Sequence, residues 1–183
     1  ISLSSGASES DNPGIQGAML ARRDHGRHLV TSITEHKAVL DTAAAMEKRG
    51  YQVTYLACDS EGLIAPEQVE KAIKTDTTLV SIMHVNNETG VISDIVRIGD
   101  LCREHDVLFH VDAAQSVGKL PIDLRTAPVD LMSMTAHKLY GPKGIGALYI
   151  ADRPGCHVEP ILFGGGQQRR LRPGTLPVHQ TAG

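Results

Sequence analysis

The sequence predicts a three-layer αβα fold in which helices cover both faces of a mainly parallel β-sheet. Short apolar runs alternate along the chain with amphipathic stretches of helical length, which is the order of elements in α/β proteins. The runs are apolar throughout rather than at every second position, as expected for strands buried on both faces. No internal repeat or low-complexity linker divides the 183 residues, so one α/β domain accounts for most of the chain.

Apolar runs predict five buried strands, over residues 28–33, 51–57, 77–85, 107–114 and 131–136. The stretch "SSGASESDN" (4–12) predicts a further strand that leads through a glycine-centred turn into a helix. Pro13 and Gly14 follow directly, and proline is disfavoured inside a helix. We therefore expect this first helix to be kinked or to start late.

Amphipathic stretches predict three helices between the strands, over residues 36–50, 65–73 and 93–106. The first ends at Gly50, a favourable C-cap, and the second carries Pro66 in its first turn. The third begins at Ser93, which we expect to act as its N-cap. From about residue 152 the pattern loosens into Gly, Pro and Arg, which predicts loops around a short strand.

Composition and charge exclude several classes of protein. Hydrophobic residues make up 41% and charged residues 21% of the chain, close to a globular average and unlike a disordered chain. No run of about 18 apolar residues is present, so we expect no transmembrane helix. The net charge of -3 provides no basic field for nucleic acid.

The three cysteines, Cys58, Cys102 and Cys156, are far apart, odd in number and without a CxxC spacing. They suggest neither a disulfide framework nor a zinc site, and the histidines show no metal-site spacing, with His28 expected at the surface. A reducing, cytoplasmic location without a signal peptide is the simplest interpretation. Both ends of the chain look cut through structure, so we expect a piece of a longer protein.

Polar side chains follow several predicted strands, and ligands of open α/β sheets bind at the carboxyl ends of the strands. These residues are Ser8, His36, Asn87, Asp112, Gln115, Thr135, His137 and Lys138. We expect them to converge on one rim of the sheet. The turn before Ser8 is a candidate phosphate site, because a helix N-terminus offers unpaired N–H groups. Simple N-capping explains that motif equally well.

Taken alone, three of these residues have ordinary explanations. Asp112 ends an apolar strand, and a buried carboxylate most often belongs to a structural ion pair. His36 at a helix start is more often a cap than a functional group. Lys138 follows a buried strand, where an amine loses solvation and becomes a nucleophile, although a lone lysine usually lies at the surface. Lys143, in a glycine-rich turn, is expected to be exposed.

Together these residues indicate pyridoxal 5′-phosphate (PLP). A protein supplies this cofactor with a lysine for its aldehyde, an acid for its ring nitrogen, a stacking group and a phosphate cradle. Lys138, Asp112, His36 and the turn at Ser8 match these needs in that order. Asp112 would keep the ring nitrogen protonated, so that the ring can take up electrons from a substrate carbanion.

The segments "TEHKAVLD", "SIMHVNNETGV", "HVDAAQSVGKLPIDL", "DLMSMTAHKLYGPKGIGALY" and "LRPGTLPVHQ" resemble the NifS/IscS-type cysteine desulfurases, PLP enzymes of fold type I. The resemblance runs in order over nearly the whole chain. It implies that residues 1–183 form a PLP-binding large domain that is partial. Full chains of this family also have an N-terminal segment and a small C-terminal domain.

The resemblance implies a role for each site residue. Lys138 is similar to the lysine that holds the cofactor, and His36 to the histidine that stacks on its ring and moves protons. Asp112 is similar to the partner of the ring nitrogen, Gln115 to the donor to the ring oxygen and Asn87 to a residue that orients substrate. The phosphate pocket is implied at Ala7, Ser8, Thr135 and His137.

Thr175 is similar to a threonine that reaches the phosphate in the neighbouring subunit, which implies a homodimer. The implied reaction converts L-cysteine to L-alanine and passes the sulfur, as an enzyme persulfide, to an iron–sulfur scaffold protein or to tRNA-thiolating partners. The family's persulfide cysteine lies in the small domain, and none of the three cysteines here aligns with it. We therefore expect these cysteines to be structural and this piece alone to be inactive.

Some positions depart from the family pattern, namely Pro13, Gly14, Pro173 and the loop "GGGQQRRLRPGT", which lacks a Glu and a Gly. They affect loop geometry more than chemistry. Two alternatives stay open: another fold type I PLP enzyme, such as a selenocysteine lyase or an aminotransferase, and a non-catalytic fragment that keeps only the sheet. No metal, nucleic acid or membrane is expected as a partner.

Overall fold

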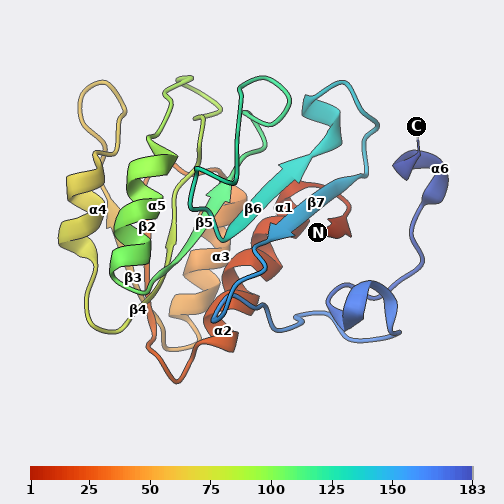
Figure 1. Ribbon diagram of the computed structural model, residues 1–183, viewed down its shortest axis with the longest axis horizontal. Coiled ribbons are helices and arrows are strands. Elements are labelled where there is room, and N and C mark those ends of the chain that lie inside the picture. The colour runs from red at the N-terminus through yellow and green to blue at the C-terminus, as the bar shows by residue number, and fades with distance from the viewer. Residues whose placement is uncertain (183) are drawn as a thin grey trace.

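The computed structural model describes residues 1–182, and a seven-stranded sheet runs through its centre (Figure 1). The strands are β1 (Ser2–Ser4), β2 (His28–Ser32), β3 (Gln52–Leu56), β4 (Thr77–Ser81), β5 (Leu108–Asp112), β6 (Leu131–Thr135) and β7 (Gly146–Ile150). Their order across the sheet is β1-β7-β6-β5-β4-β2-β3. The strands from β6 to β3 pair in parallel, whereas β7 is antiparallel to both β6 and β1. The predicted mainly parallel sheet is confirmed, with an antiparallel edge added.

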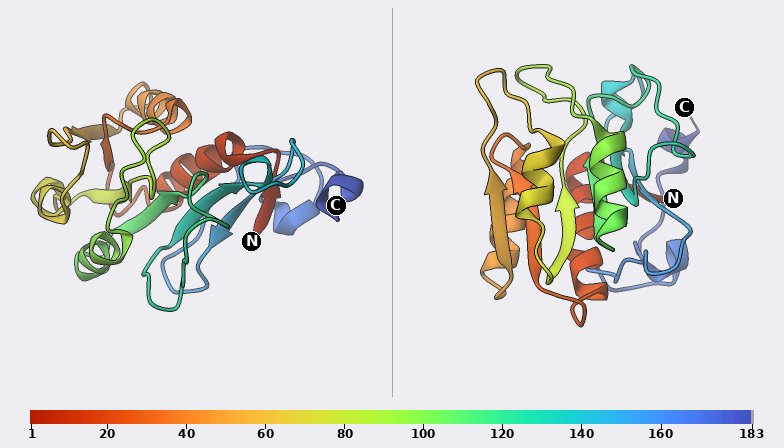
Figure 2. Two further views of the ribbon diagram at one scale, coloured as in Figure 1. Left: turned by 90° about the horizontal axis from the view of Figure 1, so that it is seen from above. Right: turned by 60° about the vertical axis from the view of Figure 1, so that its left-hand side comes forward.

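Helices cover both faces of this sheet, as the view from above in Figure 2 shows. The helices are α1 (Ala7–Asn12), α2 (Ala18–Ala21), α3 (Lys37–Glu47), α4 (Pro66–Ala72), α5 (Ile95–Glu104) and α6 (Val178–Thr181). Three further helical turns are η1 (Pro13–Gly17), η2 (Ala136–Lys138) and η3 (Gln167–Arg170). α1, α2 and α3 lie on one face and α4 and α5 on the other, which gives the three predicted layers.

Two hydrophobic cores lie on opposite faces of the sheet, and successive strand residues alternate between them. In β5, Leu108 packs in the core with α2 and α3, while Phe109 packs in the core with α4 and α5. In β4, Leu79 and Val80 divide in the same way. This is why the strands are apolar at every position. Each such buried side chain contributes about 1.5–3 kcal/mol to folding.

The first helix begins at Ala7 and passes through Pro13 without a break in the helical path. Pro13 opens the five-residue π-helical turn η1, which leads directly into α2. Proline cannot donate a backbone hydrogen bond and its ring crowds the preceding turn, whereas a π-turn is wider and relieves that crowding. The helix is therefore locally widened, and it does not start late.

The predicted caps of two helices need correction. The N-cap of α5 is Asp94 rather than Ser93, because the Asp94 carboxylate accepts the Arg97 N–H at 3.1 Å. A carboxylate also favours the positive end of a helix dipole. α3 ends at Glu47, and Gly50 lies in the turn beyond it with a φ of 85°.

The short strand predicted after residue 152 is wrong. Residues 151–182 contain no strand, only η3 and α6 within irregular chain. Side chains attach this segment to the domain: Gln168 Nε2 donates to the Leu3 carbonyl at 2.9 Å, and its Oε1 accepts the Leu3 N–H. Gln168 thus pairs with the open edge of β1 in place of a strand.

His28 was expected at the surface, but it is fully buried. Its Nδ1 lies 2.7 Å from Thr77 Oγ1 and its Nε2 lies 2.8 Å from Thr54 Oγ1. The ring therefore bridges β4 and β3 from β2, between two hydroxyl groups that satisfy both nitrogens. None of the helices in residues 1–182 is both long and apolar enough to cross a membrane.

Candidate active site

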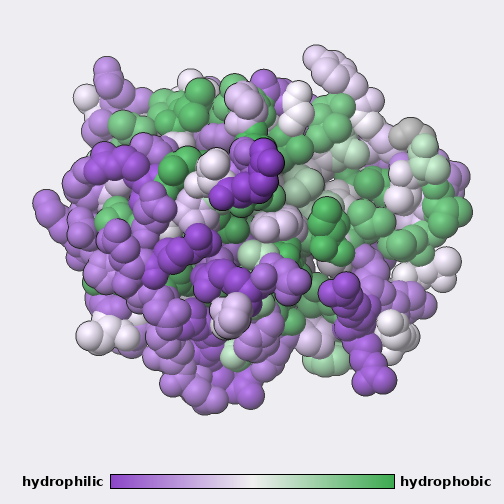
Figure 3. All heavy atoms as spheres, in the orientation of Figure 1, coloured by the Kyte–Doolittle hydropathy of each residue, from purple (hydrophilic) through white to green (hydrophobic). Residues whose placement is uncertain are grey.

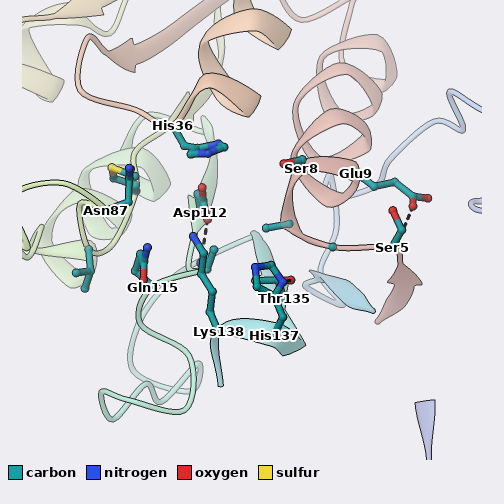
Figure 4. A pocket seen from close by; sticks show the side chains of 15 residues that line it. Ser5, Ser8, Glu9, His36, Asn87, Asp112, Gln115, Thr135, His137 and Lys138 are labelled. Carbon is teal, nitrogen blue, oxygen red and sulfur yellow. Dashed lines mark hydrogen bonds between the residues drawn. The ribbon is translucent and has the colours of Figure 1, made fainter. Parts of the chain in front are cut away.

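A cavity of about 310 Å³ opens at the carboxyl ends of the parallel strands (Figure 4). Of the ten residues predicted for the site, nine line this cavity: Ala7, Ser8, His36, Asn87, Asp112, Gln115, Thr135, His137 and Lys138. Thr175 does not line it and is exposed. The remaining lining residues were not predicted, namely Ser5, Gly6, Glu9, Met83, Val85 and Ala114.

The parallel topology brings these distant residues together. Asp112 is the last residue of β5 and Thr135 the last of β6, and these strands are neighbours. His36 follows β2 and Asn87 follows β4, on the other side of β5. Because all four strands run in the same direction, their carboxyl ends meet at one edge of the sheet.

Asp112 is 5% exposed, and it makes no salt bridge with any of residues 1–182. Its Oδ1 accepts the Ala114 N–H at 2.9 Å. Burial raises the pKa of Asp112, and the Ala114 N–H together with electrostatic interactions with His36 and Lys138 offsets this only in part. The structural ion pair considered for Asp112 is thus not formed. A buried carboxylate without a salt bridge favours a cationic partner, which a ligand in the cavity can supply.

Lys138 and His36 approach Asp112 from opposite sides of the cavity (Figure 4). Lys138 ends the turn η2, is half-buried and makes no salt bridge among residues 1–182. Lys143 is exposed in the turn that follows. Lys138 is therefore the lysine whose amine is directed into the cavity.

His36 both caps a helix and lines the cavity. Its Nδ1 accepts the Ala38 N–H at 3.1 Å at the start of α3. An acceptor nitrogen carries no proton, so this hydrogen bond places the proton of the ring on Nε2. His36 can therefore be both a helix cap and a functional group, because the cap fixes the orientation of the ring.

At the turn before Ser8, where a phosphate site was predicted, two glycines let two chain segments approach closely. Gly6 precedes α1 with a φ of 153°, a conformation that favours glycine. A Cβ on Gly146 would lie 2.5 Å from the Gly6 Cα and 2.6 Å from the Met134 carbonyl oxygen. Thr135 Oγ1 lies 2.9 Å from His137 Nδ1, so these two side chains form a second wall.

Glu9 is a lining residue that the sequence analysis missed, and its charge is balanced. Arg172 donates to its carboxylate at 2.8 Å and the Ser5 N–H at 2.7 Å. Burial raises the pKa of Glu9, but these hydrogen bonds outweigh it and leave the pKa below its usual value. The sequence signal for Glu9 was its position directly after Ser8, a residue predicted to lie on the rim.

The groups in this cavity fit PLP. An amine, a buried carboxylate without a cation, an imidazole of fixed orientation and a glycine-shaped cradle with hydroxyl groups match the aldehyde, ring nitrogen, ring face and phosphate. Among residues 1–182, no three His, Cys, Asp or Glu side chains gather where they could hold a metal ion. Fold and cavity together match one class of protein, the PLP-dependent domains of fold type I.

The particular family follows from comparison with known proteins. Residues 1–180 match the class-V aminotransferase family, and the chain belongs to it. Members of this family depend on PLP. The chain is 58% identical over 183 residues to the cysteine desulfurase IscS of Pasteurella multocida, and 56% identical to that of Cronobacter sakazakii. It spans about 45% of the length of these curated relatives.

Solved structures agree with this family. A structure described as SspA in complex with cysteine has a TM-score of 0.92 and 47% identity, covering 98% of this chain and 52% of that one. DndA from Streptomyces lividans has a TM-score of 0.91 and 46% identity, covering 97% of this chain and 51% of that one.

Proposed function

We propose that the chain is the cofactor-binding part of a PLP-dependent cysteine desulfurase, which converts L-cysteine to L-alanine and transfers the sulfur as an enzyme persulfide. The observation that carries this proposal is the meeting of Lys138, Asp112 and His36 in one cavity. The relatives named cysteine desulfurase and the related structure with bound cysteine support the choice of reaction and substrate.

In this proposal the residues of the cavity hold the cofactor and its substrate. Lys138 Nζ would bond the cofactor, Asp112 would accept a hydrogen bond from the ring nitrogen, and Gln115 would donate to the ring oxygen. Asn87 orients the substrate beside the ring. Ala7, Ser8, Thr135 and His137, which line the cavity, would hold the phosphate.

When bound, PLP supplies an electron sink for a substrate carbanion. The chain supplies the proton transfers. Once substrate occupies the cavity, the amine of Lys138 is free to take a proton from the substrate and return it. The Nε2 of His36 lies on the other side and can exchange a second proton, while its Nδ1 stays bound to α3.

The sulfur acceptor of the proposed reaction is a thiolate from outside residues 1–183. A thiolate that attacks the substrate sulfur leaves a persulfide on the enzyme, and the broken carbon–sulfur bond returns its electrons to carbon, which takes up a proton. None of the three cysteines lines the cavity. Burial raises the pKa of Cys156 to about 11 and also raises that of Cys102, so both are poor nucleophiles.

The proposal includes partners beyond the substrate. Thr175 is exposed, and we assign it to the phosphate of a second subunit in a homodimer. Large apolar side chains are also exposed, at Ile1, Tyr140, Phe163 and Val178, and Figure 3 shows apolar surface on the side of the molecule that carries β7 and the C-terminal segment. Such surface suits a protein interface. The persulfide sulfur would pass to an iron–sulfur scaffold protein or to tRNA-thiolating partners in the cytoplasm.

The full-length protein, loaded with PLP and supplied with a thiol reductant, tests this function. We expect alanine and sulfide in equal amounts from L-cysteine. An aminotransferase would instead need a keto-acid acceptor and release no sulfide. A selenocysteine lyase would turn over selenocysteine and leave cysteine nearly untouched, and a non-catalytic protein would give no product from either.

A further inference from the structure

Two loops form the wall of the cavity beside His36, and buried hydrogen bonds connect them. One loop, residues 33–36, follows β2, and the other, residues 83–87, follows β4. Glu35 Oε1 accepts the Met83 N–H at 2.8 Å and the Ser32 hydroxyl at 3.4 Å. Glu35 is only 5% exposed, although it precedes a residue that lines the cavity.

A second contact crosses between the same loops in the opposite direction. Asn86 Nδ2 donates to the Thr34 carbonyl oxygen at 2.8 Å. Asn86 Oδ1 accepts the Glu88 N–H and the Thr89 N–H, both at 2.9 Å, so this amide also shapes its own loop. We call the Glu35–Met83 and Asn86–Thr34 bonds the loop clamp.

The loop clamp lies immediately behind the cavity. On one side it holds the residues next to His36, and on the other the residues next to Asn87. Met83 and Val85 line the cavity themselves. Neither Glu35 nor Asn86 lines it, so their influence passes through their neighbours.

We propose that Glu35 and Asn86 are positioning residues, which fix His36 and the Asn87 loop at the spacing that the cofactor ring requires. This inference rests on the proposed function, because it takes that ring to lie between His36 and Asp112. The loop clamp itself is a property of the chain and is present without the cofactor.

Glu35 performs this role as a neutral acid. Burial raises its pKa well above the usual value of 4.5, and the Met83 N–H only partly offsets this. Asp112 on β5 and Asp11 on α1 face it and raise its pKa further, while the Ser32 hydroxyl lowers it. What the loop clamp needs from position 35 is therefore a hydrogen-bond acceptor of this length and not a charge.

The test compares Glu35→Gln with Glu35→Ala in the full-length protein, and adds Asn86→Ala. Glu35→Gln keeps an acceptor for the Met83 N–H, so we expect PLP affinity within about twofold of wild type. Glu35→Ala leaves that N–H buried without a partner, which predicts about 5- to 100-fold weaker binding. Glu70→Ala, at an exposed position on α4, is the matched control and should bind PLP like wild type.

Two measurements without cofactor separate this inference from the proposed function. Hydrogen exchange of the Met83 amide should speed up at least about tenfold in Glu35→Ala and stay slow in Glu35→Gln. The NMR signals of the His36 ring should shift in Glu35→Ala and in Asn86→Ala but not in Glu35→Gln.

Unchanged His36 signals and PLP affinity in both alanine variants would overturn the proposal, as would a Glu35→Gln protein as impaired as Glu35→Ala. If Glu35→Ala fails to fold, Asn86→Ala and Glu35→Gln still decide between these outcomes. A wild-type protein that binds no PLP would refute the proposed function, and the amide exchange would still report on the loop clamp.

Discussion

At the scale of single residues, three buried acidic groups lie at the cavity wall or behind it. Asp112, Glu35 and Asp11 are all buried. Asp112 raises the pKa of both Asp11 and Glu35, and Asp11 also raises that of Glu35. Both oxygens of Asp11 are without a hydrogen-bond partner among residues 1–182. Close carboxyl groups in such surroundings cannot all be ionised. Asp112, beside Lys138 and His36 and open to the cavity, is the best placed of the three to carry the charge.

Glu35 gives a testable consequence for stability. Its raised pKa means that the folded chain keeps a proton which the unfolded chain releases above pH 4.5. The contribution of Glu35 to the free energy of unfolding is therefore fully present below that pH. It falls by about 1.4 kcal/mol per pH unit as the pH rises toward the folded-state pKa. Glu35→Gln removes this loss.

The measurement for Glu35 is denaturant unfolding of the wild type and of Glu35→Gln at a series of pH values. The two free energies should be similar near pH 4 and diverge above it, with the variant more stable. Glu70→Gln, at an exposed position, should leave the pH dependence unchanged. A constant difference between wild type and Glu35→Gln at all pH values would contradict a neutral Glu35.

At the scale of elements, the antiparallel edge shapes the proposed phosphate cradle. β7 lies between β6 and β1, so Gly146 is placed against the turn that contains Gly6. Both the approach of the two backbones and the position of Ser8 depend on the missing side chain at Gly146. β7 thus contributes to the site although none of its residues lines the cavity.

Gly146→Ala should damage both stability and the cradle. Its Cβ would meet backbone atoms of Gly6 and Met134 at 2.5 and 2.6 Å, and backbone cannot rotate away as a side chain can. We expect a loss of about 1–3 kcal/mol in the free energy of unfolding, together with weaker PLP binding. Gly166→Ala, where no atom lies within 4 Å of the new Cβ, should do neither. Unfolding curves and PLP titration measure both effects.

Much of this arrangement could be predicted from local patterns. The strands buried on both faces and the polar residues after them were predictable, because both follow from the chain's own periodicity and from the geometry of parallel sheets. The antiparallel edge of the sheet was not predictable in this way. Gln168 contacts β1 from 165 residues away, and no local pattern reports such a contact.

Local patterns also failed to show which residue caps α5 and which polar side chains are buried. Asp94 was overlooked because Ser93 is an equally good cap by residue type. Glu35 and Asp11 lie in segments that resemble exposed turns and helix ends, and only the tertiary fold shows that they are buried. His28 was misplaced for the same reason, since its hydroxyl partners come from two other strands.

At the scale of the whole molecule, the chain spans about 45% of its curated relatives, and the proposed enzyme depends on groups outside residues 1–183. Within the chain, the exposed Thr175 is the residue that the proposal assigns to a second subunit. A homodimer would then contain two composite cavities. Each would hold Lys138 from one subunit and Thr175 from the other.

Complementation between variants tests this assignment. In a hybrid of Lys138→Ala and Thr175→Ala subunits, one cavity regains both a lysine and a threonine if Thr175 acts on its partner. That hybrid should recover wild-type PLP affinity in half of its cavities, while the pure Thr175→Ala protein binds about 2- to 10-fold more weakly, as expected for a lost hydrogen bond. No recovery in the hybrid would place Thr175 in its own subunit or outside the site.

The most direct test of the account is to find which residue bonds the cofactor. The full-length protein is mixed with PLP and reduced with borohydride, which makes the carbon–nitrogen bond permanent, and its peptides are analysed by mass spectrometry. We expect the label on Lys138 in the wild type and in Lys143→Ala, and no label in Lys138→Ala. A label on Lys143 or any other lysine, or label that persists in Lys138→Ala, would contradict the account.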